Sequence, residues 1–462
     1  MSELRDLKKK PLDNPIQTLM GIFVSIFVLL FFMFLLKDVG SGVQNTVANF
    51  LSLTLAIVVL ANMTGLRKVI GDGVVMKVVV AALVVATISL VFSRYFVYNR
   101  YIEGLYGHLS HTEHDLMYNQ MQIISTRLSS GQSLAAAIEG LQLNQYHNIF
   151  VYSSMIFLVG GINLTNMIVW STLHMVICAV CMTLMCYHYG ITDQKRLNFI
   201  LTLSLCQPIF WAVHHYNKVI VGQAFVMVAL YIYVCSFRHS WLNMALFPVY
   251  AWLMWSMRLQ YLLIAVVLCL VCIVVSNKKR HMTMLIQMAV VFIVAVLLVA
   301  SIDINSFLET DLNFSSYTED SDYSLLIMPM RLLRSFLPYF PFTNLFSDKH
   351  WAFNVFCILQ ITLNLVLWYL VITRALMKRK LKKLFANPMF IAAVGFFCAG
   401  LLSAIHTTYV SVGTILLLSE VEDVKGSRMF INCVFTFMLL MFVSVIYFAL
   451  GLTGSVSSGV VI

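Results

Sequence analysis

Residues 16–36 read IQTLMGIFVSIFVLLFFMFLL and contain no charged side chain. An α-helix needs about 20 apolar residues to cross the hydrocarbon core of a bilayer, and it pairs its backbone polar groups within the segment. This stretch has the required length and follows the basic run Lys8-Lys9-Lys10. No small-residue cleavage site follows it, so we expect a retained membrane anchor rather than a removed signal peptide.

The rest of the chain has the same character. Of its 462 residues, 60% are hydrophobic and only 11% are charged, whereas soluble domains carry about 25% charged residues. Long apolar runs occupy thirteen ranges, namely 16–36, 43–64, 70–92, 149–163, 166–188, 197–215, 219–237, 241–257, 259–276, 283–302, 351–373, 388–407 and 429–451. We therefore predict an all-α, polytopic integral membrane protein with about 12–13 transmembrane helices. We expect them to form a single transmembrane domain, residues 1–462.

The positive charges indicate how the chain is oriented. The formal net charge is +10, and most Lys and Arg residues lie at the N-terminus and in short loops after the second, fifth, seventh, ninth and eleventh runs. Such clusters collect on the cytoplasmic side of a membrane. We therefore expect a cytoplasmic N-terminus and two long external loops, 93–148 and 303–350. The net charge is a signal of membrane topology and not of nucleic-acid binding.

One segment conflicts with this orientation. Loop 93–148 should be external and Lys195 internal, which requires an odd number of crossings between them, yet two apolar runs lie there. The first run, 149–163, is short and contains Gly160-Gly161. One explanation is that it enters and leaves on the same face as a re-entrant segment, which must then be buried in protein or line a cavity. The other is that the first three runs have different boundaries.

The first candidate for chemistry is Asp115, which follows His114 in loop 93–148 and precedes an amphipathic stretch, 116–141. A carboxylate beside a histidine just outside a membrane can act as a general base on a sugar hydroxyl. The alternative is structural, because Asp is also a preferred N-cap residue where a helical pattern begins.

Several cations lie at external helix ends. Lys218 begins an apolar run and could bind a phosphate, with His215 just before it, although a lysine at a helix end can also snorkel to the interface. Arg258 is the charge that separates two apolar runs, and ionisable residues at membrane depth are functional by default. The alternative is an arginine in a turn within the aromatic belt.

A second basic pair lies in loop 303–350. Arg331 and Arg334 are three residues apart and share a helix face. Two guanidinium groups on one face could clamp a diphosphate bidentately. Contact with lipid headgroups is the alternative.

What is missing from the sequence also narrows the function. It contains no P-loop, no GxGxxG fingerprint and no cluster of acids within a span. A transporter binds its substrate near the membrane midplane, whereas almost all of the polar chemistry here lies at external helix ends. We therefore expect an enzyme at the outer leaflet. We assign no cofactor and no metal site, since the ten cysteines lie in or beside apolar runs, although a divalent metal stays possible.

The external residues resemble a family. Asp115, Tyr118 and a helix ending in Ser-Ser-Gly are similar to the first external loop of C-type glycosyltransferases, which use lipid-linked sugars. Residues 148–163 are similar to the span that follows that loop. Residues 208–218 resemble a pattern that runs from a proline to an Asn-Lys pair at an outer helix start. Many relatives have an acid after that lysine, and Val219 stands there in this chain.

The later part of the likeness is to bacterial polysaccharide polymerases of the O-antigen and capsule type. It rests on Arg258 with the following Gln260-Tyr261 and on residues 331–341, and the whole resemblance covers most of residues 110–345. It implies an undecaprenyl-diphosphate-linked glycan substrate at the periplasmic face of the bacterial inner membrane. Loops 93–148 and 303–350 would then be periplasmic.

The resemblance also implies roles for the candidates. An acceptor hydroxyl would attack the anomeric carbon, with Asp115 or His114 as base. The leaving diphosphate would be stabilised by cations, for which the candidates are Lys218, His215, Arg258, Arg331 and Arg334. Expected partners are a flippase and a chain-length regulator, besides the lipid bilayer. Two alternatives stay open, namely a C-type transferase that adds a single sugar and a flippase of lipid-linked oligosaccharide.

Overall fold

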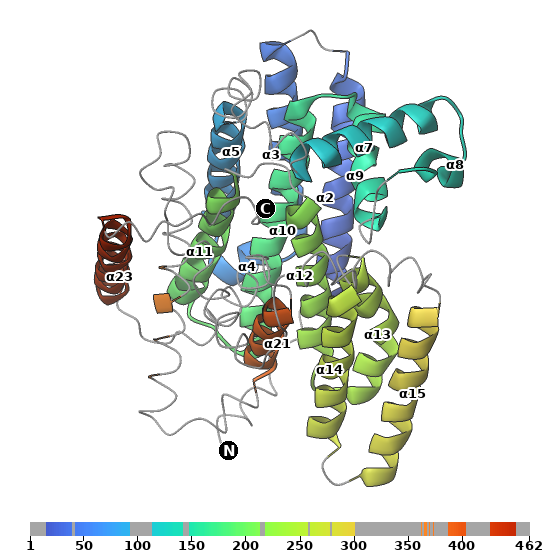
Figure 1. Cartoon of the computed structure of the whole chain (residues 1–462), viewed down its shortest axis with the longest axis vertical. Helices are drawn as coiled ribbons and strands as arrows, with labels where there is room; N and C mark the ends of the chain where they lie inside the picture. The colour runs from blue at the N-terminus through green and yellow to red at the C-terminus, as the bar shows by residue number, and fades with distance from the viewer. Residues whose placement is uncertain are drawn as a thin grey trace. The chain divides into compact units, whose positions relative to one another are not determined.

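The computed structural model describes most of the apolar part of the chain, in helices throughout (Figure 1). The described ranges are 15–38, 42–92, 113–141, 147–212, 218–256, 259–277, 280–300, 387–402 and 426–449, with single residues 362, 365, 366, 369 and 373. For some residues in these helices, among them 113–117 and 218–219, only the backbone is described. No strand occurs in the described ranges, which confirms the all-α prediction.

The chain divides into two compact units, Met1–Leu259 and Gln260–Ile462. The helices of the first unit are α2 (Pro15–Leu36), α3 (Val43–Met63), α4 (Leu66–Ile70), α5 (Val74–Phe92), α7 (Glu113–Ser129), α8 (Leu134–Ile138), α9 (His147–Gly160), α10 (Leu164–Tyr189), α11 (Gln194–Ala212), α12 (Lys218–Ser236) and α13 (Ser240–Trp255). The second unit contains α14 (Leu259–Ser276) from its second residue onward, α15 (His281–Ala300), α21 (Pro388–Leu402) and α23 (Gly426–Ala449). A single transmembrane domain over 1–462 stays a prediction.

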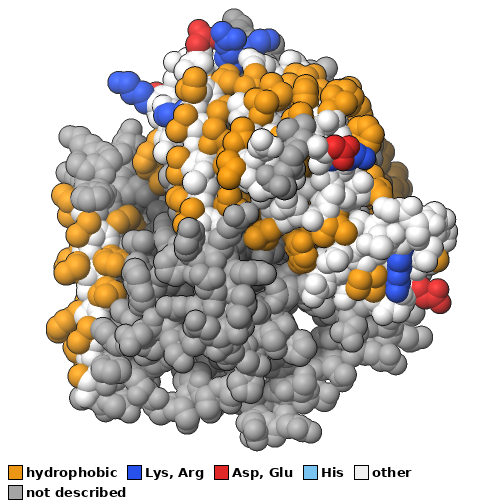
Figure 2. Space-filling view, turned by 90° about the horizontal axis from the view of Figure 1, so that it is seen from above, with side chains coloured by type: hydrophobic (Ala, Val, Ile, Leu, Met, Phe, Trp, Pro, Cys, Tyr) orange, Lys and Arg blue, Asp and Glu red, His pale blue; other side chains and the backbone are white. Residues whose placement is uncertain are grey.

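Helices coincide with twelve of the thirteen predicted apolar runs, while run 351–373 lies largely outside the described residues. Among the described helices, five are long and apolar enough to cross a membrane, namely α2, α3, α5, α10 and α15. Hydrophobic side chains cover much of the described surface in Figure 2, and Met438 of α23 is 61% exposed. The structure therefore confirms a polytopic membrane protein.

Helix α10 is the centre of the first unit. It packs against α3, α5, α9, α11 and α12, and its residues from Thr165 to Cys186 are buried. Both of its ends are capped by residues adjacent to the helix. Asn163 accepts a hydrogen bond from the backbone N–H of Thr165 at 2.9 Å, and Gly190 ends the helix with a φ of 118°, as an N-cap residue and a left-handed terminal glycine do.

Hydrogen bonds between helices fix the direction of α10. Near its start, Asn166 accepts from Asn49 in the first part of α3, at 2.6 Å. Near its end, His188 lies 3.3 Å from the hydroxyl of Tyr231, which donates to Thr18 near the start of α2 at 2.9 Å. Helix α10 thus runs from the end of the unit where α2 meets α3, here called the upper end, to the end where α2 begins, the lower end (Figure 1).

A further hydrogen bond fixes the direction of α5 and the path of the chain around α9. Lys77, near the start of α5, donates to Asn198 near the start of α11 at 2.8 Å, so α5 starts at the lower end and runs upward. The chain then returns to the upper end to begin α10, without a net crossing. Helix α9 has 14 residues, about 21 Å at 1.5 Å per residue, which is shorter than the hydrocarbon core. This path fits a re-entrant segment.

Candidate functional site

The upper end of the first unit carries the helix predicted to hold the catalytic base. The amphipathic stretch 116–141 forms α7 and α8, with a turn at Gly131, where φ is 84°. Helix α7 begins at Glu113, so His114 and Asp115 lie within its first turn. Asp115 is therefore not the N-cap residue, although an acid in the first turn still stabilises the helix dipole.

The structure brings together the helices that carry two of the predicted site residues. Helix α7 packs against α9 and α12, and α12 begins at Lys218. The side chains of His114, Asp115 and Lys218 lie outside the described part of the chain, as do His215, Arg258, Arg331 and Arg334 altogether. Asp115 and Lys218 are therefore on neighbouring helices, while the roles of all seven residues stay predictions.

Apolar contacts hold α7 on α9. The ring of Tyr118 meets that of Phe157 edge-on, with centroids 5.2 Å apart, and Met121 and Ile124 are fully buried. Partial burial raises the pKa of the Tyr118 hydroxyl, because desolvation disfavours the phenolate. Tyr118 therefore stays neutral at physiological pH and contributes packing and a polar tip to the upper end.

Arg127 fastens α8 to α7. Its Nη1 atom donates to the backbone carbonyls of Ala136, Ala137 and Glu139 at 3.5, 3.2 and 2.8 Å. These carbonyls lie at the C-terminal end of α8, where helix groups lack partners within the helix and cations are favoured. These hydrogen bonds thus hold α8 against the C-terminal end of α7.

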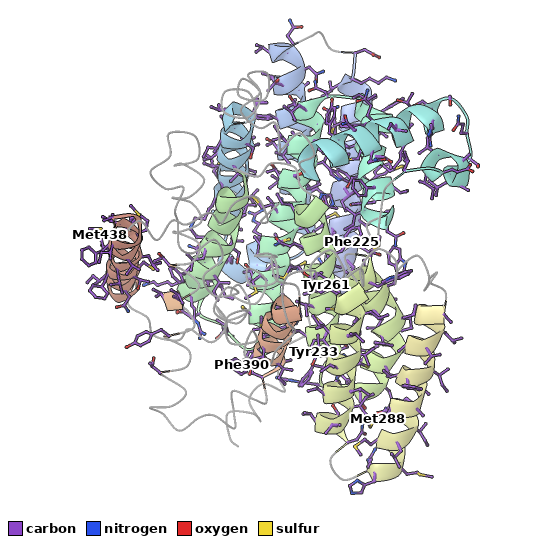
Figure 3. All side chains as sticks on the ribbon, in the orientation of Figure 1. Phe225, Tyr233, Tyr261, Met288, Phe390 and Met438 are labelled. Atoms are coloured by element: carbon purple, nitrogen blue, oxygen red, sulfur yellow. The ribbon has the colours of Figure 1, made fainter. Side chains whose placement is uncertain are left out.

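A buried polar cluster lies between α9, α10 and α12. His174 is 1% exposed; its Nδ1 lies 2.7 Å from the carbonyl of Trp170 and its Nε2 lies 2.8 Å from the hydroxyl of Tyr152. A carbonyl only accepts, so Nδ1 carries the proton, and Nε2 of the neutral ring accepts from Tyr152. The Tyr152 ring also packs against Trp170 and against Phe225 of α12, with centroids 4.9 and 5.1 Å away. Phe225 is labelled in Figure 3.

An asparagine pair holds the turn between α9 and α10. The amide nitrogen of Asn166 donates to the carbonyls of Gly160 and Gly161 at 2.9 and 2.6 Å, and its oxygen accepts from Asn49. Gly161 has a φ of 85°, and a Cβ atom on Gly160 would lie 3.1 Å from the Asn166 nitrogen. The backbone conformation of Gly161 therefore favours glycine, and a side chain at Gly160 would push against the Asn166 amide, so this turn fixes the upper end of α9.

Four buried polar atoms in the same helices have no hydrogen-bond partner among the described residues. They are Oε1 of Gln120 in α7, Oγ of Ser153 in α9, Nε1 of Trp170 in α10 and Nε2 of Gln223 in α12. Buried polar atoms in folded proteins are normally paired with protein, water or ligand. Helices α7, α9, α10 and α12 thus offer both donors and acceptors to a hydroxyl-rich molecule or to water.

Three polar residues of the helix interior, His174, Asn166 and Asn49, were not among the candidates predicted from the sequence. His174 and Asn166 lie within run 166–188, and Asn49 lies within run 43–64. A histidine or asparagine inside a long apolar run is costly in a bilayer and marks a helix face turned towards protein. These polar residues within apolar runs are visible in the sequence and indicate that α3 and α10 are interior helices.

Metal binding is not established by the described side chains. No three His, Cys, Asp or Glu residues come together for a metal ion in the described ranges, and the seven described cysteines are free thiols. The side chains of His108, His111, His114 and His147 lie outside the described part of the chain.

Comparison of the chain with protein-family models, with curated proteins and with solved structures gives no match in any of the three. The class of protein that the fold and the upper end define is an all-α, multi-pass membrane protein. At one end of the first unit it has an amphipathic hairpin, α7–α8, whose helix α7 packs against α9 and α12.

Proposed function

We propose that the chain is a glycosyltransferase of the bacterial inner membrane that polymerises undecaprenyl-diphosphate-linked repeat units in O-antigen or capsule synthesis. The observation that carries the proposal is the packing of α7, with Asp115 in its first turn, against α12, which begins at Lys218. A carboxylate and an ammonium group on adjacent helices match the two needs of glycosyl transfer, a base for the acceptor and a cation for the leaving group.

In the proposed reaction, the acceptor hydroxyl attacks the anomeric carbon of the donor glycan. Its proton passes to Asp115 or His114, a new C–O bond forms, and the bond from the anomeric carbon to the lipid diphosphate breaks. The diphosphate leaves with the bonding electrons. Its charge is stabilised by charge-assisted hydrogen bonds from Lys218, His215, Arg258, Arg331 and Arg334.

Buried polar groups of α7, α9, α10 and α12 support the proposal by their chemistry. Four buried polar groups have no partner among the described residues and can hydrogen-bond the hydroxyls of a glycan. They are the amides of Gln120 and Gln223, the hydroxyl of Ser153 and the indole of Trp170. Polar groups of this kind orient ligands in small-molecule sites. In this proposal they orient the acceptor beneath α7.

The test is the glycan that accumulates when the gene is deleted from its host. A repeat-unit polymerase leaves single complete repeat units on the lipid carrier. A transferase of one sugar leaves units that lack that sugar. A flippase leaves complete units on the cytoplasmic leaflet, out of reach of an external glycan-modifying probe.

Complementation of the deletion then tests the base. Asp115→Asn should abolish the ladder of chain lengths on a gel at normal expression, because the amide cannot accept the proton. Glu139→Gln is the matched control, since Glu139 is an exposed acid in the same external segment. Wild-type ladders from Asp115→Asn would eliminate Asp115 as the base and leave His114 as the candidate.

A further inference from the structure

Helix α4, Leu66–Ile70, places two cations at the lower end of the first unit. Leu66 and Val69 are 0% and 5% exposed, and α4 packs against α3, α5, α10 and α11. Arg67 and Lys68 point outward and are exposed. The short helix is thus anchored by its apolar side and presents its basic side at the membrane boundary.

Neighbouring elements add to this charge. Lys77 lies near the start of α5, and Lys195 lies near the start of α11, which packs against α4 and α5. We call the four residues Arg67, Lys68, Lys77 and Lys195 the α4 surface. Two acids described in this region, Asp72 and Asp193, are engaged locally. Asp72 pairs with Arg67 at 2.6 Å, and Asp193 accepts from the backbone N–H of Lys195 at 3.1 Å.

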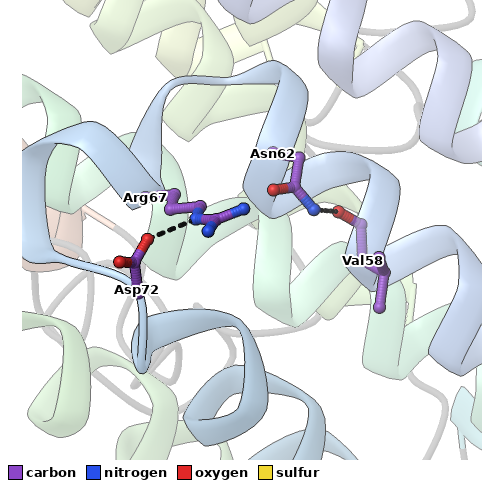
Figure 4. Close-up of polar contacts among 4 residues, drawn as sticks. All are labelled: Val58, Asn62, Arg67 and Asp72. Carbon is purple, nitrogen blue, oxygen red and sulfur yellow. Dashed lines mark hydrogen bonds and ion pairs between the residues drawn. The ribbon is translucent and has the colours of Figure 1, made fainter.

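The α4 surface keeps hydrogen-bond donors available. Arg67 uses its Nε atom in the ion pair with Asp72 (Figure 4), so its two terminal NH2 groups have no partner among the described residues. The ammonium groups of Lys68 and Lys195 likewise have no partner in the described part of the chain. The end of a guanidinium group binds a phosphate through two parallel hydrogen bonds.

An exposed apolar stripe lies along α5, the helix that carries Lys77. Met76, Val80 and Val84 are four residues apart and are 67%, 51% and 47% exposed, so they share one face of the helix. This stripe begins next to Lys77. Cations at a membrane boundary followed by an exposed apolar face match a molecule with a phosphate head and an acyl tail.

We propose that the α4 surface binds the headgroup of an anionic glycerophospholipid. Arg67 holds the phosphate end-on, Lys68 and Lys195 flank it, and the acyl chain lies along the stripe of α5. Clusters of Lys and Arg at the end of a membrane helix attract anionic headgroups in this way. The inference does not depend on the proposed transferase activity.

The experiment uses the full-length protein, purified in mild detergent, with phosphatidylglycerol and phosphatidylcholine of identical acyl chains. Lipid binding is measured by native mass spectrometry. We expect phosphatidylglycerol to bind preferentially and Lys68→Gln/Lys195→Gln to weaken that binding roughly 25-fold. The control Lys37→Gln/Arg238→Gln removes the same charge from exposed residues on other elements and should bind as wild type.

Three results would overturn the proposal. The first is equal binding of the two lipids. The second is equal loss in the control, which would show a general effect of net charge. The third is displacement of the lipid by inorganic phosphate at low millimolar concentration, which would show a site for free anions. Elution of each variant as the wild-type monodisperse peak confirms that it is folded.

Discussion

Helices α2 and α10 are both apolar and long enough to cross a membrane, yet they meet their surroundings in opposite ways. Helix α10 is buried on all sides within the first unit. Helix α2 buries one stripe, consisting of Thr18, Gly21, Ile22, Ser25, Leu29 and Met33. Its other face exposes large side chains, including Phe23 at 67% and Phe27 at 59%.

Whether a helix face is buried in protein depends on its small and polar residues rather than on the overall hydrophobicity of the helix. The buried stripe of α2 contains Thr18, Gly21 and Ser25, and Gly21 lies so close to α3 that an added Cβ would be 3.0 Å from Met63 and Thr64. Lipid tails are as apolar as leucine, so close packing and hydrogen bonds, not hydrophobicity, drive helix association in a bilayer. Polar residues within apolar runs therefore indicate which face packs against protein.

The largest expected effect is at the polar interior of α10. Asn166→Leu removes hydrogen bonds to Gly160, Gly161 and Asn49 and leaves their polar groups buried. We expect it to lower the free energy of unfolding by about 2–4 kcal/mol, measured by denaturant titration in detergent.

Asn62→Leu is the matched control. Asn62 is exposed and donates only to Val58 of its own helix, at 2.7 Å (Figure 4). Its substitution should change stability by about 0.5 kcal/mol or less. Equal effects of the two variants would show that the asparagine pair does not hold α9.

The membrane helices were largely predictable from the sequence because an apolar run of sufficient length encodes its helix locally. Run 219–237, for example, corresponds to α12, Lys218–Ser236. Breaks inside a run were harder to predict. The first residues of run 70–92 are not part of α5, because Ile70 ends α4 and a turn follows at Gly71, where φ is 116°. This turn was not predicted, because the conformation of a glycine depends on the packing around it.

The candidate site was less predictable because its contacts join distant parts of the sequence. Asn49 and Asn166 are 117 residues apart, and Tyr152 and His174 are 22 residues apart on different helices. Residue type and spacing show that such side chains need partners but not which partners they find. Asp115 and Lys218 could be assigned to helix starts, whereas the packing of α7 on α12 required the structure.

An intermediate effect is expected at the Tyr152–His174 contact. Tyr152→Phe keeps the ring against Trp170 and removes one hydrogen bond, leaving Nε2 of His174 without its donor. We expect a loss of about 1 kcal/mol in the free energy of unfolding. Tyr118→Phe is the control, since no hydrogen bond of its hydroxyl is described, and it should be nearly neutral. If the control were the more damaging variant, the buried contact would not stabilise the interior.

The smallest effect is expected on the outer face of α2. Phe27 stacks on Phe31, with centroids 6.2 Å apart, and is otherwise exposed to the bilayer. Because lipid solvates leucine as well as phenylalanine, Phe27→Leu should change the free energy of unfolding by about 0.5 kcal/mol or less. Leu29→Ala, at a fully buried position of the same helix, is the positive control and should cost about 2 kcal/mol through the cavity that it leaves. A large loss from Phe27→Leu would mean that this face packs against protein, which would remove the contrast with α10.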